Sequence, residues 1–157
     1  MIKHKYAFKA VYKIVSRLLW QEWNTKDSKL VFIMLNPSKA DASIDDPTLR
    51  RCIGFAKSWA FGSLIVINLF VYRSSKPSKL RQVNALVGEQ NDRHLKKAIK
   101  SADKVVVAWG NNVKLMQRDR MVLDLLSNRN VQPYCLGTTK AGYPLYVMCS
   151  KQLRVYR

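Results

Sequence analysis

The chain has 157 residues, of which 48% are hydrophobic and 24% charged. That is the composition of a globular domain and excludes wholesale disorder. It contains 28 Lys plus Arg against 10 Asp plus Glu, a formal net charge of +18 at pH 7. Because such a charge suits a polyanionic partner, we expect nucleic acid, DNA in preference to RNA, and no membrane.

The cysteines and histidines indicate neither a metal site nor a secreted protein. Cys52, Cys135 and Cys149 are widely spaced, odd in number and form no C-x-x-C pattern, and there are only two histidines. We therefore predict no metal and no cofactor. Free thiols and the lack of a secretory signal in residues 1–9 favour a cytoplasmic location.

The first half of the chain predicts two elements clearly and one ambiguously. Residues 5–20 fit a strand followed by a turn as well as an amphipathic helix. Residues 30–35 form a continuous apolar run, which predicts a strand buried on both faces. Asp46 and Pro47 suit the start of a helix, because Asp caps free amides and Pro has the right φ. We predict that Gly62 ends this helix.

The second half continues the alternation of strand and helix. We predict strands at residues 63–72, 104–109 and 131–136, and helices at residues 91–102 and 113–126. Apolar strands separated by helices are typical of a parallel sheet covered on both faces. We therefore expect an α/β three-layer sandwich with a central, mostly parallel four-stranded sheet. It would form a single domain over residues 1–157, with a basic N-terminal segment at 1–21 and a basic C-terminal tail at 147–157.

The loop after the first buried strand contains the candidate catalytic residues. In α/β folds, ligands bind beyond the carboxyl ends of the strands. We predict that Asn36 holds a base edge or orients a water there and that Asp41 and Asp45 act as general base. The alternatives are that these carboxylates bind a hard cation, close a turn or cap the following helix. The neighbouring residues Pro37 and Ser38 are predicted to contact substrate.

Polar residues also follow the second and third strands. Asn68 lies in an apolar strand and needs a hydrogen-bond partner, so it contacts substrate or braces a loop. Arg73 can bind a phosphate through two parallel hydrogen bonds from its guanidinium. Gly110 would let a ligand approach the backbone closely, and Asn111 either contacts that ligand or caps the next helix.

Acid-free segments predict where phosphates bind. Residues 1–21 and 73–81 contain no Asp or Glu, and no acid follows Asp124. Several cations on one surface give salt-dependent binding to a nucleic-acid backbone. The alternatives are a basic protein that is merely soluble and one that binds an anionic membrane surface. The residues predicted to contact the nucleic-acid backbone are Lys39, Lys76, Lys79 and Arg81.

Six strings in the sequence resemble a bacterial and phage family of unknown function. They are MLNPSKAD, DDPTLRRCIGFAKSWAFG, LIVINLFVYRSSKP, VGEQNDRHL, VVVAWGNN and CLGTTKAGYPLY. The resemblance covers roughly residues 30–146 and implies no activity by itself.

The order of the motifs also resembles the uracil-DNA glycosylase superfamily. Asn36-Pro37 is similar to the loop that positions the attacking water, and Asn68 and Arg73 are similar in spacing to the N-x-x-x-x-R-P motif. The resemblance implies a parallel sheet between helices and a DNA-repair hydrolase that excises a base flipped out of the stack.

The last loop of that superfamily carries a histidine that steadies the departing base. Here residues 142–147 read GYPLYV, without a histidine. Its role would fall to Lys140, Tyr143 or Tyr146, which we therefore include among the predicted substrate-binding residues.

Three functions remain open from the sequence. They are a DNA base-excising N-glycosylase, a non-catalytic DNA- or RNA-binding accessory module, and a nucleotide-processing enzyme. The charge and the missing histidine favour the module, whereas the cluster of Asn36, Asp41 and Asp45 favours an enzyme. No phosphate-binding P-loop, G-x-G-x-x-G or G-x-S-x-G motif occurs, which argues against those enzyme classes.

Overall fold

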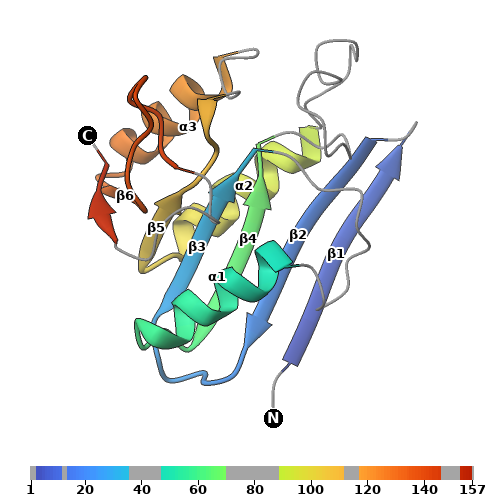
Figure 1. The fold of residues 1–157 in the computed structure, drawn as a ribbon. Coiled ribbons are helices and arrows are strands. Elements are labelled where there is room, and N and C mark those ends of the chain that lie inside the picture. Colours follow the sequence, from blue (N-terminus) through green and yellow to red (C-terminus); the bar gives the residue numbers. More distant parts are fainter. Residues whose placement is uncertain are drawn as a thin grey trace.

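A computed structural model describes residues 3–11, 14–35, 47–69, 89–111, 117–145 and 153–156. In these ranges the chain forms one seven-stranded sheet, in the order β1-β2-β4-β3-β5-β6-β7, and three helices (Figure 1). The strands are β1 (Lys3–Val11), β2 (Ile14–Glu22), β3 (Lys29–Met34), β4 (Ser63–Asn68), β5 (Lys104–Val107), β6 (Pro133–Cys135) and β7 (Arg154–Val155). The helices are α1 (Pro47–Ser58), α2 (Glu89–Ser101) and α3 (Arg118–Asn128).

The four central strands, β4, β3, β5 and β6, are parallel, as the apolar runs predict. The predicted total of four strands is wrong, because antiparallel strands extend the sheet at both ends. On one side β2 pairs with β4 and β1 pairs with β2, and on the other β7 pairs with β6. The rule of continuous apolar residues finds only strands buried on both faces, so it misses β1, β2 and the two-residue β7, whose sequences mix polar and apolar residues. Within residues 5–20 the described parts are therefore two antiparallel strands and not a helix.

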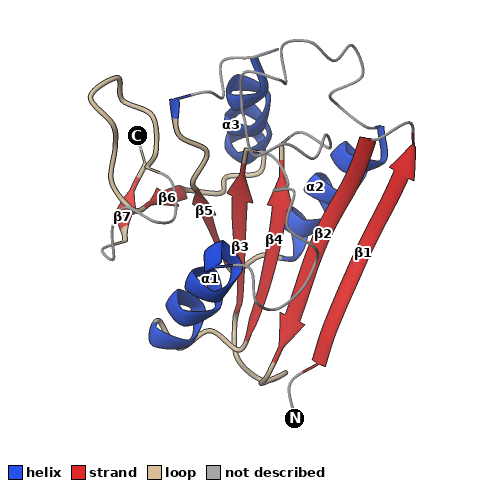
Figure 2. Ribbon diagram, turned by 45° about the vertical axis from the view of Figure 1, so that its right-hand side comes forward, coloured by secondary structure: helices blue, strands red, loops and turns tan. Residues whose placement is uncertain are grey.

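Helices cover both faces of the sheet and divide the core in two (Figure 2). On one face, alternate residues of β3, β4 and β5 pack against α2 and α3; on the other face, the intervening residues pack against α1. The first cluster includes Val31, Ile33, Ile65, Ile67, Leu95, Ile99, Val107, Val122 and Leu126. The second includes Leu30, Phe32, Leu64, Cys52, Phe55, Ala56 and Val106. This alternation follows from the two-residue period of a strand.

Two predicted helix boundaries are corrected by the backbone. The chain leaves α1 through Ala60, whose φ is 63°, and not through Gly62. Gly62 is needed for a different reason, because a Cβ there would collide with the carbonyl oxygen of Asn24. The third helix begins after Gln117, whose φ of 53° cannot belong to a helix, and not at residue 113. No helix in the described ranges is both long enough and apolar enough to cross a membrane.

Candidate functional site

The carboxyl ends of the four parallel strands meet along one edge of the sheet, which we call the carboxyl edge. It comprises the ends of β3, β4, β5 and β6 and the segments that follow them. Figure 2 shows the arrowheads of β3 and β4 pointing to this edge. The sequence places every predicted catalytic and substrate-binding residue in or beside these segments, and this is the edge at which ligands bind in open α/β sheets.

Many of the predicted site residues lie outside the described residues. The segments that contain them start at the carboxyl edge, because β3 ends at Met34 and β4 ends at Asn68. Their roles stay predictions. The predicted site residues outside the described ranges are Asn36, Pro37, Ser38, Lys39, Asp41, Asp45, Arg73, Lys76, Lys79, Arg81 and Tyr146.

Asn68 is the last residue of β4 and lies at the carboxyl edge. It is 8% exposed and pairs in register with Met34 at the end of β3. The next amide, on Leu69, donates a hydrogen bond to the Met34 carbonyl at 2.8 Å. Asn68 is therefore fixed at the point where the segments from β3 and β4 leave the sheet.

The segment after β5 is tied to the loop after β6. The N–H of Gly110 donates to the carbonyl of Pro144 at 2.9 Å, and the Thr139 hydroxyl lies 2.7 Å from Oδ1 of Asn111. Gly110 has a φ of 74°, which favours glycine, although a Cβ there would meet open space. Asn111 thus braces the last loop, and Gln117, not Asn111, stands at the N-terminus of α3.

Residues 137–145, the last loop, fold back on themselves. Leu145 N–H donates to the Gly137 carbonyl at 2.9 Å, and Thr139 N–H donates to the Tyr143 carbonyl at 2.7 Å. Lys140 is exposed near the turn, whereas Tyr143 is partly buried against the core. Of these two predicted substrate contacts, Lys140 is therefore the more exposed.

Arg118 is a buried cation beneath the carboxyl edge that the sequence did not reveal. It is 5% exposed, and its guanidinium joins the starts of α2 and α3 to the end of β4. Nε and Nη2 donate to the Leu69 carbonyl at 3.1 and 2.9 Å, and Nη2 lies 2.6 Å from Oδ1 of Asp92. The partners are 49 and 26 positions away in the chain, so local patterns could not identify them. Arg118 thus holds the carbonyl of Leu69, the residue that follows Asn68.

Trp109 and Tyr156 form an aromatic pair beside the last loop. Trp109 is 1% exposed, and in the described part of the structure its indole N–H has no hydrogen-bond partner. Its ring meets that of Tyr156 edge-on, with centroids 6.5 Å apart. The Tyr156 hydroxyl donates to the Gly142 carbonyl at 3.1 Å. Burial, followed by the nearby Cys135, Asp119 and Tyr143, raises the pKa of Tyr156, so it stays neutral at physiological pH.

Comparison with known proteins identifies a family and a distant set of folds. Residues 17–146 match the family described as "Protein of unknown function (DUF1643)". No curated protein is similar enough to count as a match.

Among solved structures, a putative hydrolase from Agrobacterium vitis S4 is 10% identical with a TM-score of 0.43, over 85% of this chain and 50% of that one. The esterase Est22 is 11% identical with a TM-score of 0.42, over 88% and 46%. The chain thus spans about half the length of these proteins. Likenesses of this size support neither an activity nor a substrate.

Proposed function

This chain belongs to the DUF1643 family of proteins of unknown function, and we propose that it binds nucleic acid at the carboxyl edge of its sheet. The distribution of charge carries the proposal. The net charge is +18, and the segment that follows β4 has four cations and no acid at residues 73–81. Lys140 adds an exposed cation on the last loop.

Nucleic acid fits this charge better than a small anion does. A single nucleotide needs one or two cations, whereas a strand of nucleic acid presents a phosphate at about every 3.4 Å along its axis. Cations from several segments at one edge of the sheet can contact successive phosphates. Each contact releases counterions, so the affinity should fall steeply with salt.

The proposal is tested by salt-titrated binding of labelled DNA and RNA, single- and double-stranded. With six or more phosphate contacts, the affinity should fall by about 10³-fold or more between roughly 50 and 200 mM salt. Changing Lys76, Lys79 and Arg81 together to Gln should weaken binding and flatten the salt dependence.

The matched control removes the same charge elsewhere. Lys96, Lys97 and Lys100 are exposed on α2 and lie in its C-terminal half. There the N–H of Asp103 donates to the carbonyl of Lys29, at the amino end of β3. Changing these three lysines to Gln should affect binding little. Affinity that does not respond to salt, or equal losses in both triple variants, would overturn the proposal.

A base-excising enzyme is the second candidate, favoured by the buried amide of Asn68 at this edge. In this mechanism one base leaves the stack and Asn68 binds its edge. Asn36 orients a water that adds to the sugar carbon as the bond to the base nitrogen breaks. Asp41 or Asp45 takes the water proton, and the base leaves as an anion near Lys140.

The test is alkaline cleavage of labelled DNA that contains normal, deaminated and modified bases. Strand breaks at one base type that disappear in Asn36→Ala would support excision. DNA that is retarded in the gel but uncut would indicate a non-catalytic binding module. DNA that is neither retarded nor cut would favour a small nucleotide as the substrate.

A further inference from the structure

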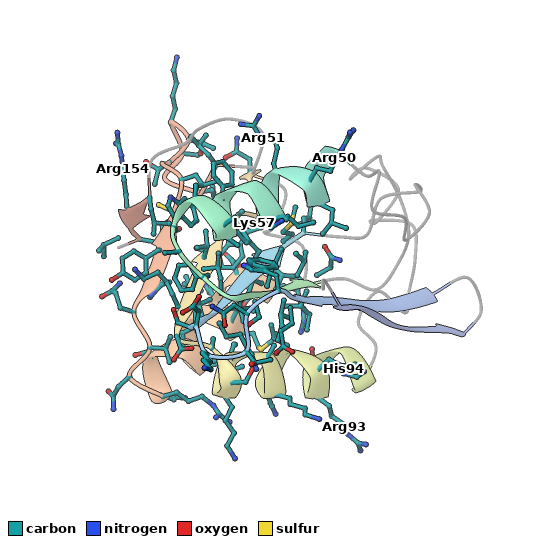
Figure 3. All side chains as sticks on the ribbon, turned by 90° about the horizontal axis from the view of Figure 1, so that it is seen from below. Arg50, Arg51, Lys57, Arg93, His94 and Arg154 are labelled. Atoms are coloured by element: carbon teal, nitrogen blue, oxygen red, sulfur yellow. The ribbon has the colours of Figure 1, made fainter. Side chains whose placement is uncertain are left out.

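The outer surface of α1 carries cations around a glycine. Residues three and four positions apart are neighbours on a helix, so Gly54 is surrounded by Arg50, Arg51, Lys57 and Ser58. The sequence of α1 contains no Asp or Glu, and Arg50, Gly54, Lys57 and Ser58 are exposed. Figure 3 shows Arg50 and Arg51 directed outward from α1, on the opposite side of the sheet from Arg93 and His94 of α2.

The fold does not require a glycine at position 54. A Cβ there would meet no atom within 4 Å, whereas a Cβ at Gly62 would collide with the backbone. A glycine inside a helix is also less favourable than an alanine. What Gly54 does provide is open access to the helix backbone from outside.

A shallow hollow of about 310 Å³ lies over this position, lined by Arg51, Gly54, Phe55 and Ser58. Aromatic contacts hold its floor in place. The guanidinium carbon of Arg51 is 5.7 Å from the ring centroid of Phe55, and the Phe55 and Trp59 rings stack with centroids 5.1 Å apart. The hollow therefore combines an apolar floor with cations beside it.

We propose that this hollow and its flanking cations, the α1 groove, bind the phosphodiester backbone of the nucleic acid held at the carboxyl edge. The α1 groove comprises Arg51, Gly54, Phe55 and Ser58, with Arg50 and Lys57 beside it. This inference rests on the proposed function. Its first support is charge complementarity, because α1 itself carries three cations and no acid, and Arg50 and Arg51 are directed outward. The second is the open backbone at Gly54, over which a strand can pass closely.

The length of α1 fits several nucleotides of a strand. The helix runs from Pro47 to Ser58 across one face of the sheet and ends near Gly62, whose N–H donates to the carbonyl of Ser28 beside the amino end of β3, so the groove extends from the face of the sheet toward its amino edge. From Arg50 to Lys57 the helix rises about 10 Å, at about 1.5 Å per residue. That distance corresponds to about three nucleotides at 3.4 Å each. Lys57 is held beside the groove, with Nζ 5.4 Å from the ring centroid of Trp23.

The test fills the groove without removing a charge. Gly54→Leu should weaken binding of a fluorescein-labelled DNA strand or its duplex roughly tenfold, the loss of one or two phosphate contacts. Gly54→Ala should have a smaller effect on binding and should raise Tm by about 2–4 °C, since alanine is the better helix former. A loss of binding in Gly54→Ala, measured together with its higher Tm, cannot come from unfolding. Ser127→Leu places the same side chain on the exposed surface of α3 and should bind normally.

A charge variant supplies an independent readout. Changing Arg50 and Lys57 together to Gln should make the plot of log affinity against log salt less steep, by the amount expected for the loss of about two phosphate contacts. Wild-type affinity in Gly54→Leu, with binding still lost in the Lys76, Lys79 and Arg81 triple variant, would overturn the α1 groove alone. If the unmodified protein binds neither DNA nor RNA, the proposed function and this inference both fall.

Discussion

Arg118→Ala should lower the free energy of unfolding by about 3 kcal/mol. The substitution removes a buried guanidinium that donates to the Leu69 carbonyl through two nitrogens and pairs with Asp92 at 2.6 Å. It leaves the Asp92 carboxylate without its cation and removes two donors from the Leu69 carbonyl. The ends of β4, α2 and α3 would lose their common link.

The magnitude follows from the burial of the two partners. Removing one member of a buried ion pair costs about 3–5 kcal/mol, because the other charge is left uncompensated. The Arg118 side chain is 6% exposed, but the Asp92 side chain is 35% exposed, so water can partly solvate the carboxylate. This places the expected cost at the lower end of the range. The two guanidinium hydrogen bonds to the Leu69 carbonyl are lost as well, which adds to this cost.

Urea denaturation followed by tryptophan fluorescence measures the effect, since Trp109 is buried near the same edge. Arg118→Lys keeps the charge but cannot bridge both partners, so its loss should be intermediate. The control is Arg120→Ala, an exposed arginine on the same helix, which should change stability by less than about 0.5 kcal/mol. If Arg118→Ala were as mild as Arg120→Ala, the bracing role of the guanidinium would be refuted.

Three further predictions concern other parts of the fold. Gly62→Ala should destabilise the protein by about 1–3 kcal/mol in urea denaturation, because its Cβ would lie 2.6 Å from that of Asp27; wild-type stability would show that the turn adapts freely. Since burial raises the pKa of Tyr156, the folded state keeps a proton that the unfolded state loses, so stability should fall as pH rises above about 10. Tyr156→Phe should remove part of that fall in denaturation curves at several pH values, and an unchanged pH dependence would contradict this. Thr139→Val removes the hydroxyl bond to Asn111 and should cost less than about 1 kcal/mol while making the last loop more sensitive to limited proteolysis; equal proteolysis rates would mean that the loop does not depend on it.

The sequence predicted the centre of the fold well because the signal there is local. A continuous apolar run such as residues 30–35 has few alternatives to a buried strand, and β3 follows it closely. The sequence could not decide between paired strands and an amphipathic helix at residues 5–20, because the mixture of basic and apolar positions there fits both structures. Pairing with β4, more than 40 residues further along, decides between them.

The same distinction applies to the site. Asn68, Gly110 and Asn111 were predicted at the carboxyl edge because parallel topology alone puts the ends of buried strands together, and the structure places them there. Arg118 was missed because its role depends on contacts between three distant segments. The α1 groove was missed because an exposed glycine in a helix has no meaning until the space above it is known.

The free edge of β1 affects how the protein behaves in concentrated solution. In the described part of the chain this nine-residue strand pairs only with β2, so its outer backbone groups can template the strand of another copy. Lys3, Lys5 and Lys9 lie along it, and paired strands are only about 4.8 Å apart. Repulsion between lysines thus opposes edge-to-edge assembly at low ionic strength, but at about 1 M salt the screening length falls to about 3 Å. High salt would therefore weaken this protection against edge-to-edge assembly.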